Sequence, residues 1–82
     1  MWGMAPRVVM YSRRTCGLCD EARTAIESVL ARVPFAFEEV FIDGNDSFEE
    51  RYGLRVPVVE VDGREVFEYE VRTEELARLV AG

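Results

Sequence analysis

The sequence has no histidine and only two cysteines, Cys16 and Cys19, among its 82 residues. Without an imidazole to act as a base, the serine-type and papain-type catalytic triads are excluded. The commonest metal ligand is missing for the same reason. A small secreted domain held together by disulfides normally carries more cysteines at wider spacings, so a disulfide framework is not expected. What remains for chemistry is one closely spaced pair of thiols.

Long apolar segments and an excess of basic charge are also lacking. No stretch of the sequence approaches the roughly 20 apolar residues that cross a bilayer. Residues 1–6 do not show the basic start and apolar stretch of a signal peptide, so we expect a cytoplasmic protein with no membrane partner. With 10 basic and 16 acidic residues the formal net charge is −6, and an acidic surface repels the phosphates of nucleic acids. Nucleic acid is therefore not an expected partner.

The composition is that of one folded domain. Hydrophobic residues make up 49% of the chain, which suits a packed core and is too high for a disordered protein. The 82 residues leave no room for a second domain. Gly3 and Pro6 interrupt any pattern at the start, so we expect residues 1–6, with Trp2, to form an exposed and mobile tail. The domain is expected over residues 7–82, as a monomer.

Short apolar runs and a helical periodicity alternate through the first half of the domain. The run from Arg7 to Ser12 predicts a strand that is buried on both faces. Apolar residues then recur at three- and four-residue steps and predict a helix from about Cys16 to Arg32, which Pro34 ends. The residues predicted to line its apolar side are Leu18, Ala22, Ala25, Ile26, Val29, Leu30 and Val33. Aromatic and β-branched residues from Phe35 to Ile42 predict a second strand.

A turn and a short helix are predicted next. Asp43-Gly44-Asn45-Asp46 is a turn sequence. Ser47 followed by Glu50 has the pattern of a capping box and predicts the start of the helix. Gly53 is expected to end that helix in the left-handed conformation.

The last third of the chain predicts a hairpin and a final helix. Val56 to Val61 predicts a strand, and the Asp62-Gly63 turn predicts that residues 64–69 return antiparallel beside it. Thr73 is expected to cap the final helix. The order is β-α-β-α-β-β-α, in which the helix joining the first two strands makes them parallel with a right-handed connection. The fold class is therefore α/β, with a mixed four-stranded sheet flanked by helices.

The cysteine pair, in Cys16-Gly17-Leu18-Cys19, lies where a strand ends and a helix begins. The backbone N–H groups of a first helical turn have no internal partner, and the helix dipole is positive there. A thiolate at that point is stabilised, and its pKa falls from about 8.5 to roughly 3.5–7.5. Cys19 lies one turn further in and should be shielded. We therefore expect Cys16 to attack a substrate disulfide and Cys19 to resolve the mixed disulfide.

Three arginines accompany this pair in the sequence. Arg13 and Arg14 directly precede the motif, and Arg55 lies two residues before a proline. If the loops converge, the three guanidinium groups surround Cys16, lower its pKa further and attract an anionic thiol substrate. Asp20 and Glu21 act in the opposite direction, and the alternative is that the arginines are solvated surface residues. The remaining charged residues are assigned to the solvated surface, among them Glu38, Glu39 and Glu65.

The cysteine pair has other interpretations. A zinc site needs two further ligands, which only carboxylates or a second subunit could supply here. A structural disulfide that closes so short a loop stabilises weakly. A second hypothesis for function is a metal-binding or iron–sulfur-cluster-binding module shared between two subunits through Cys16. A third is a non-catalytic interaction domain, since fold does not determine function. Redox activity is the favoured interpretation, with no metal site.

Two segments resemble a known family. Tyr11-Ser12-Arg13-Arg14-Thr15-Cys16-Gly17-Leu18-Cys19 resembles the active-site segment of glutaredoxin-like members of the thioredoxin superfamily, and Arg55-Val56-Pro57-Val58-Val59 with Asp62-Gly63 resembles their second signature. The resemblance spans residues 7–82 and implies a thioredoxin fold. It departs in two places: Gly17 and Leu18 replace the usual proline and aromatic residue, and residues 69–73 lack a glycine pair.

The resemblance also implies roles for individual residues. Pro57 should follow a cis peptide bond and pack against the cysteine pair, while the backbone of Val56 binds the substrate backbone in antiparallel fashion. Arg13 corresponds to a basic residue near the glutathione carboxylate. Apart from the resemblance, we also expect Arg14, Thr15 and Arg55 in the substrate site, because they lie beside the cysteine motif and Pro57 in the sequence. The implied activity is reduction of protein disulfides or glutathione-type mixed disulfides by a dithiol, which a reductase or thiol reductant regenerates. No bound cofactor is expected, and glutathione is a candidate co-substrate.

Overall fold

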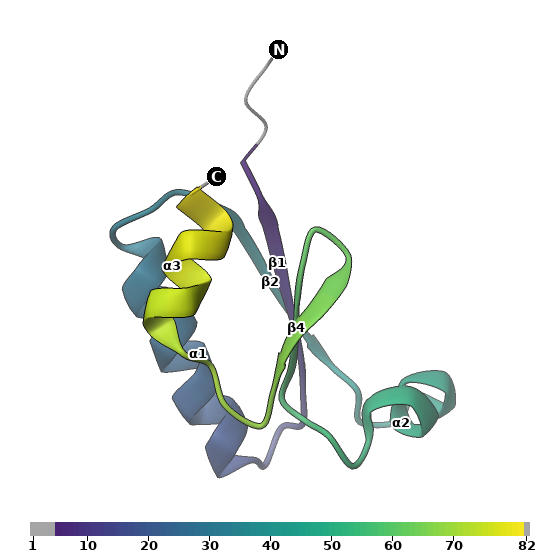
Figure 1. The fold of residues 1–82 in the computed structure, drawn as a ribbon. Coiled ribbons are helices and arrows are strands. Elements are labelled where there is room, and N and C mark those ends of the chain that lie inside the picture. The colour runs from purple at the N-terminus through teal and green to yellow at the C-terminus, as the bar shows by residue number, and fades with distance from the viewer. Residues whose placement is uncertain (1–4, 82) are drawn as a thin grey trace.

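The computed structural model describes residues 5–81, so most of the expected tail, including Trp2, lies outside the described residues. The elements follow the predicted order (Figure 1). They are β1 (Arg7–Ser12), α1 (Gly17–Leu30), β2 (Ala36–Phe41), α2 (Asp46–Tyr52), β3 (Val58–Val61), β4 (Arg64–Glu68) and α3 (Thr73–Ala81).

The four strands form one mixed sheet in the order β2-β1-β3-β4. β1 is parallel to β2 and antiparallel to β3, and β3 is antiparallel to β4. The hairpin turn has positive φ angles at both central residues, 51° at Asp62 and 86° at Gly63. Such a turn matches the twist of the strands that it connects, which is why an Asp-Gly pair favours it. The predicted α/β fold class and sheet topology are confirmed.

Helices cover the two faces of the sheet unequally. Figure 1 shows α1 and α3 together on one side, whereas the short α2 stands at one end of the other side. The main core lies under α1 and α3 and consists of Val8, Met10, Ala22, Ile26, Val29, Phe35, Val59, Val61, Phe67, Leu76 and Val80. Regular three- and four-residue spacing in α1 directs its buried side chains into this core.

A second, smaller core lies beneath α2. Its buried members are Ile42, Tyr52 and Val58, and the rings of Tyr11 and Tyr52 stack with centroids 4.1 Å apart. Val56 packs against this cluster. The smaller core therefore holds the segment that leads into β3, on the opposite face of the sheet from α1.

Three of the predicted caps are wrong in detail. Asn45 rather than Ser47 caps α2, because its side-chain oxygen accepts the Phe48 N–H at 3.0 Å. An Asn, Asp and Ser in succession all suit this position, and the sequence pattern does not choose between them. α3 begins at Thr73 itself, and the preceding carbonyl of Arg72 accepts the first helical hydrogen bond from Leu76 at 2.9 Å.

Gly53 is the third correction. It ends α2 in the right-handed conformation, with φ −50° and ψ −39°, rather than in the left-handed one. A side chain at this position would collide with the carbonyl oxygen of Glu49 and come within 3.1 Å of the guanidinium of Arg13. Lack of space, rather than backbone conformation, explains the glycine.

Candidate active site

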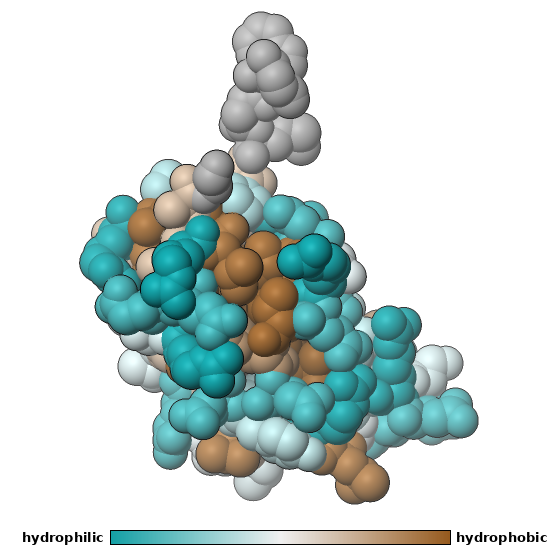
Figure 2. Space-filling model, viewed as in Figure 1, coloured by the Kyte–Doolittle hydropathy of each residue, from teal (hydrophilic) through white to brown (hydrophobic). Residues whose placement is uncertain are grey.

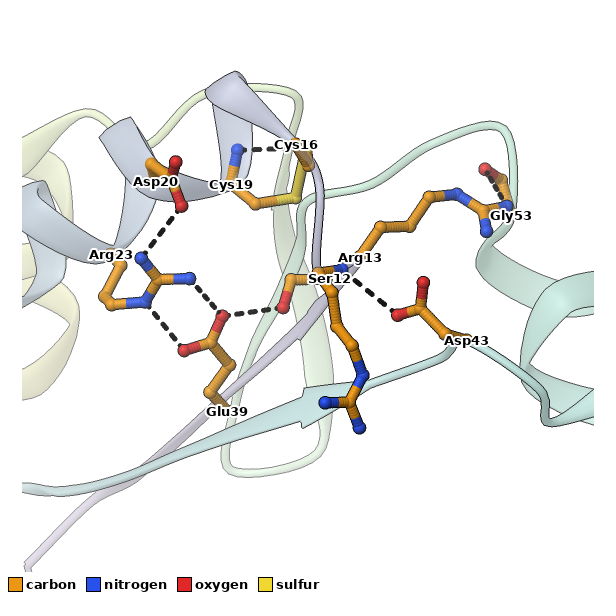
Figure 3. Close-up of a disulfide and its surroundings, with 10 residues drawn as sticks. Ser12, Arg13, Cys16, Cys19, Asp20, Arg23, Glu39, Asp43 and Gly53 are labelled. Atoms are coloured by element: carbon orange, nitrogen blue, oxygen red, sulfur yellow. Dashed lines mark hydrogen bonds and ion pairs between the residues drawn. A yellow bond between two sulfur atoms is a disulfide. The ribbon is translucent and has the colours of Figure 1, made fainter.

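Cys16 occupies the N-cap of α1. Its backbone is extended, with φ −154° and ψ 109°, and its carbonyl accepts the first helical hydrogen bond from Asp20 at 3.1 Å. Its Sγ accepts a hydrogen bond from the Cys19 N–H, also at 3.1 Å. The two sulfurs are joined in a disulfide with a Cα–Cα distance of 5.2 Å (Figure 3). The sulfur of Cys16 thus takes the place that a serine or aspartate oxygen takes in an ordinary cap.

The two cysteines differ in exposure. Cys19 is completely buried, whereas Cys16 is half-buried at the surface. Leu18, predicted to lie on the apolar side of the helix, is instead 47% exposed. Successive residues of a helix point about 100° apart, so the inward position of Cys19 turns its neighbour toward solvent. Cys16 is therefore the more accessible residue of the pair, and Cys19 is shielded.

The segment before β3 lies beside the end of β1. Tyr11 pairs with Val58, so Pro57 is adjacent to the point where β1 leads into the cysteine loop. Pro57 is fully buried, and the peptide bond that precedes it is cis. Its carbonyl accepts the Tyr69 N–H at 2.9 Å. Within residues 5–81, the N–H and carbonyl of Val56 form no hydrogen bond, which leaves both groups available to a ligand.

Arg13 does not face the cysteine pair. Its guanidinium binds both carboxylate oxygens of Glu49, at 2.8 and 2.5 Å, and the carbonyl of Gly53 at 3.0 Å. Figure 3 shows the side chain extending away from the disulfide toward Gly53. The hydrogen bonds from Arg13 lower the pKa of the Glu49 carboxyl, and Glu49 in turn raises the pKa of Arg13. In this structure the guanidinium of Arg13 therefore forms a bidentate pair with Glu49 rather than a contact with Cys16.

The other two arginines are engaged as well. Arg55 binds Glu65 and Glu68 on β4, each at 2.9 Å. The guanidinium of Arg14 lies 5.0 Å from the ring centroid of Phe41, and its backbone N–H binds Asp43 at 3.1 Å. The structure therefore does not form the expected ring of three guanidinium groups, because carboxylates and an aromatic ring lie within their reach. Thr15 lies exposed in the loop directly before Cys16.

A network that the sequence analysis missed lies beneath the disulfide (Figure 3). The sequence analysis assigned Glu39 of β2 to the solvated surface. Its carboxylate instead accepts two hydrogen bonds from Arg23 and one from the buried hydroxyl of Ser12, each at 2.7 Å. Arg23 also binds Asp20 at 3.0 Å. The bonds from Arg23 are the main reason that the pKa of the Glu39 carboxyl is lowered. The alternation along β2, which places Glu39 on the same face as Phe37, is the sequence signal for this position.

Neither a metal cluster nor a membrane-spanning helix is found in the described part of the chain. Between residues 5 and 81, no group of three or more cysteine, aspartate or glutamate side chains is placed to hold a metal ion. Over the same range, no helix has the length and apolar character needed to cross a bilayer.

Comparisons with known proteins agree with this arrangement. Structural genomics target protein XcR50 from X. campestris is 36% identical, with 88% of this chain and 92% of that one covered and a TM-score of 0.73. Protein Ne2328 from Nitrosomonas europaea is 24% identical, and the match covers 98% of this chain and 96% of that one with a TM-score of 0.82. A mutant thioredoxin from Halobacterium salinarum is 23% identical, and the match covers 94% of this chain and 73% of that one with a TM-score of 0.64. The last two comparisons show the fold, which is the expected thioredoxin fold.

The family follows from the sequence match. The Glutaredoxin-like domain (DUF836) matches residues 7–81, nearly the whole chain. That range includes β1, both cysteines and the segment of Pro57. The Cys16–Cys19 pair and the fold fit a thiol oxidoreductase. This chain therefore belongs to the glutaredoxin-like domain family (DUF836).

Proposed function

We propose that this protein is a thiol–disulfide oxidoreductase in which Cys16 is the nucleophile and Cys19 the resolving cysteine. The observation that carries the proposal is the asymmetry of the pair. The Cys16 sulfur caps α1 and accepts an N–H hydrogen bond, and Cys16 is only half-buried, whereas Cys19 is completely buried. An accessible sulfur can meet a substrate, and a shielded one can react only with its neighbour.

The cap position favours the thiolate of reduced Cys16. A hydrogen bond to the charged form of a group stabilises that form, and the Cys19 N–H is already directed at the sulfur. The positive end of the helix dipole adds to this effect. Asp20, in the first turn, opposes it, but its carboxylate is bound to Arg23 at 3.0 Å. The ion pair with Arg23 therefore offsets the negative charge of Asp20, which would otherwise disfavour a thiolate at Cys16.

The reaction transfers two electrons to the substrate. The Cys16 thiolate attacks one sulfur of the substrate disulfide, that S–S bond breaks, and the second substrate sulfur leaves as a thiolate that takes up a proton. Cys19 then loses its proton, and its sulfur attacks Cys16. The mixed disulfide breaks, and the other substrate sulfur leaves as a thiol. The product is the Cys16–Cys19 disulfide found in the structure, which two equivalents of an external thiol, or one dithiol, reduce again.

The segment before β3 is the proposed docking strand for the substrate. Val56 offers an N–H and a carbonyl that no other described residue uses, and it lies next to the buried Pro57. An extended peptide beside Val56 can form backbone hydrogen bonds as an added strand does. This pairing would present a substrate sulfur to Cys16.

The proposal is tested with chemically reduced protein, freed of reductant, and two substrates. One is insulin, a protein disulfide, and the other is a peptide carrying a glutathione mixed disulfide. We expect Cys16→Ser to abolish reduction of both. Cys19→Ser should retain the first step and accumulate a mixed disulfide on Cys16, detected as added mass. Turnover by Cys16→Ser, or a mixed disulfide on Cys19 in preference to Cys16, would overturn the assignment of roles.

A further inference from the structure

Three exposed apolar side chains lie at the same end of the molecule as the cysteine pair. Leu18 and Tyr69 are each 47% exposed and Leu54 is 93% exposed. They belong to three segments that meet at the end of the molecule where α1 begins (Figure 1). In the same view, Figure 2 shows hydrophobic side chains reaching the surface along this edge. The Tyr69 hydroxyl donates to the carbonyl of Leu54 at 3.2 Å, which joins two of the segments. These side chains contribute little to the core, so their exposure requires another explanation.

A shallow hollow separates Leu18 from Tyr69. Its volume is about 140 Å³, and Glu21 and Glu70 lie on its walls together with Ala22 and Val71. Neither glutamate forms an ion pair with any residue in the range 5–81. The hollow therefore combines apolar walls with two unneutralised carboxylates, directly beside the cysteine motif.

The cations that could offset this charge are bound elsewhere. Arg13 is held by Glu49, and Arg55 by Glu65 and Glu68. A ligand carboxylate that approached the hollow would meet two like charges and no available guanidinium among the residues that line it. Like charges in close juxtaposition disfavour binding, whereas a cation in the same place is attracted. The charge pattern at the site is thus opposite to the one that an anionic thiol such as glutathione requires.

We infer that the substrate is a polypeptide disulfide in which apolar side chains flank the cysteine and a lysine or arginine lies nearby in the sequence. The inference rests on the proposed function and specifies its substrate class. Apolar side chains of the substrate pack on Leu18, Leu54 and Tyr69. The cation binds Glu21 and Glu70 in the hollow. Side chains of an extended peptide alternate at about 3.3 Å per residue, so a cation close in sequence to the cysteine can reach the hollow while the backbone pairs with Val56.

The test uses reduced full-length protein in a single turnover, with no other reductant present. The probes are disulfide dimers of short peptides in which leucine flanks a central cysteine and each end carries arginine, serine or glutamate. Oxidised glutathione is the small anionic probe. Each rate constant is divided by that of dithiothreitol with the same probe, which removes the intrinsic reactivity of the disulfide. We expect the arginine peptide to react about tenfold faster than the glutamate peptide, since each exposed charge pair contributes modestly.

Matched variants assign this preference to the hollow. The double variant Glu21→Gln with Glu70→Gln removes two charges and should reduce the arginine-to-glutamate ratio to about twofold or less. Glu27→Gln with Glu50→Gln makes the same change in net charge at two exposed positions that form no ion pair with any residue from 5 to 81. Glu27 lies about 9 Å further along the helix axis than Glu21. This control should keep the wild-type ratio.

A third variant tests the apolar part of the surface. Leu54→Ser should slow the leucine peptides about fivefold and leave peptides with glycine beside the cysteine unchanged, because less apolar area is buried in the complex. Folding is not at risk, since Leu54 is 93% exposed.

The outcomes separate the inference from the function. The inferred substrate class is overturned if the Glu21 and Glu70 substitutions leave the arginine-to-glutamate rate ratio unchanged. It is also overturned if oxidised glutathione reacts as fast as the arginine peptide. In both cases the oxidoreductase activity still stands. Inactivity of the wild-type protein toward every probe, the uncharged serine peptide included, overturns both.

Discussion

The ion pair between Arg23 and Glu39 should be the most important polar contact for stability. Replacing Arg23 by methionine keeps the aliphatic part of the side chain. Among residues 5–81, it leaves the Glu39 carboxylate with Ser12 as its one remaining hydrogen-bond partner. The side chain of Arg23 is 29% exposed and that of Glu39 is 15% exposed. Exposed pairs contribute about 0–1 kcal/mol, and breaking a fully buried pair costs about 3–5 kcal/mol. We therefore expect the free energy of unfolding to fall by about 2 kcal/mol at neutral pH, between these limits.

A matched control is available at Glu38, the residue before Glu39 on β2. Arg7 and Glu38 form an ion pair at 2.6 Å, but their side chains are 64% and 51% exposed. Arg7→Met should lower the free energy of unfolding by less than about 0.5 kcal/mol, because solvent screens the pair. Urea titrations of the oxidised proteins, followed by far-UV circular dichroism, measure both differences. Equal losses for the two variants would refute the reasoning from burial.

The decrease in the free energy of unfolding caused by Arg23→Met should also depend on pH. Glu39 has a lowered pKa in the folded state. A depressed carboxyl pKa contributes stability that is present above the unfolded value of about 4.3 and is lost as the pH falls through the folded pKa. The difference between wild type and Arg23→Met should therefore be largest near about pH 7 and shrink toward about pH 3. A difference that stays constant over this range would show that the lost contacts are not electrostatic.

Three further predictions follow from single positions. Gly53→Ala should lower the free energy of unfolding by about 1–3 kcal/mol, measured by urea titration, because the added methyl group meets the Glu49 carbonyl; Gly17→Ala, with open space around it, should not. Leu54→Ser should leave the thermal midpoint unchanged in calorimetry, since the side chain is almost fully exposed; a marked decrease would mean that Leu54 packs on the fold. Alkylation of reduced Cys16 by iodoacetamide should be half-maximal well below the ordinary thiol value of about pH 8.5, and an ordinary profile would argue against activation by the helix.

Signals that are local in sequence predicted the architecture well. The bounds of β1 were predicted correctly from one apolar run, and the Asp62-Gly63 turn located the hairpin. Two strands and the helix between them were enough to give the parallel pairing. The strand and the turn depend on residues within a few positions of one another, which is the range over which propensity and turn geometry act. The parallel pairing joins distant residues such as Arg7 and Ala36, and it was predictable because a strand–helix–strand connection has a preferred geometry.

The partners of charged side chains were not predictable in the same way. Arg13 binds Glu49, 36 positions away, and Arg23 binds Glu39, 16 positions away. A sequence contains no local signal for such contacts, because folding brings the two residues together. The hypothesis that three guanidinium groups surround Cys16 failed for this reason, because the sequence does not predict the direction in which each guanidinium points. Glu39 was missed because its charge suggested solvent, although its strand position faces α1.

The division of the interior into two cores has a consequence for how this protein can diversify. The reactive thiols are supported by α1 and the main core, whereas the segment of Val56 is supported by Tyr11, Tyr52 and the smaller core on the other face. The two clusters of buried residues are separate. Substitutions beneath α2 can therefore change which disulfides are accepted without changing the acidity of the attacking sulfur. Docking of the substrate backbone at Val56 and reactivity at Cys16 are separable traits, open to independent selection or redesign.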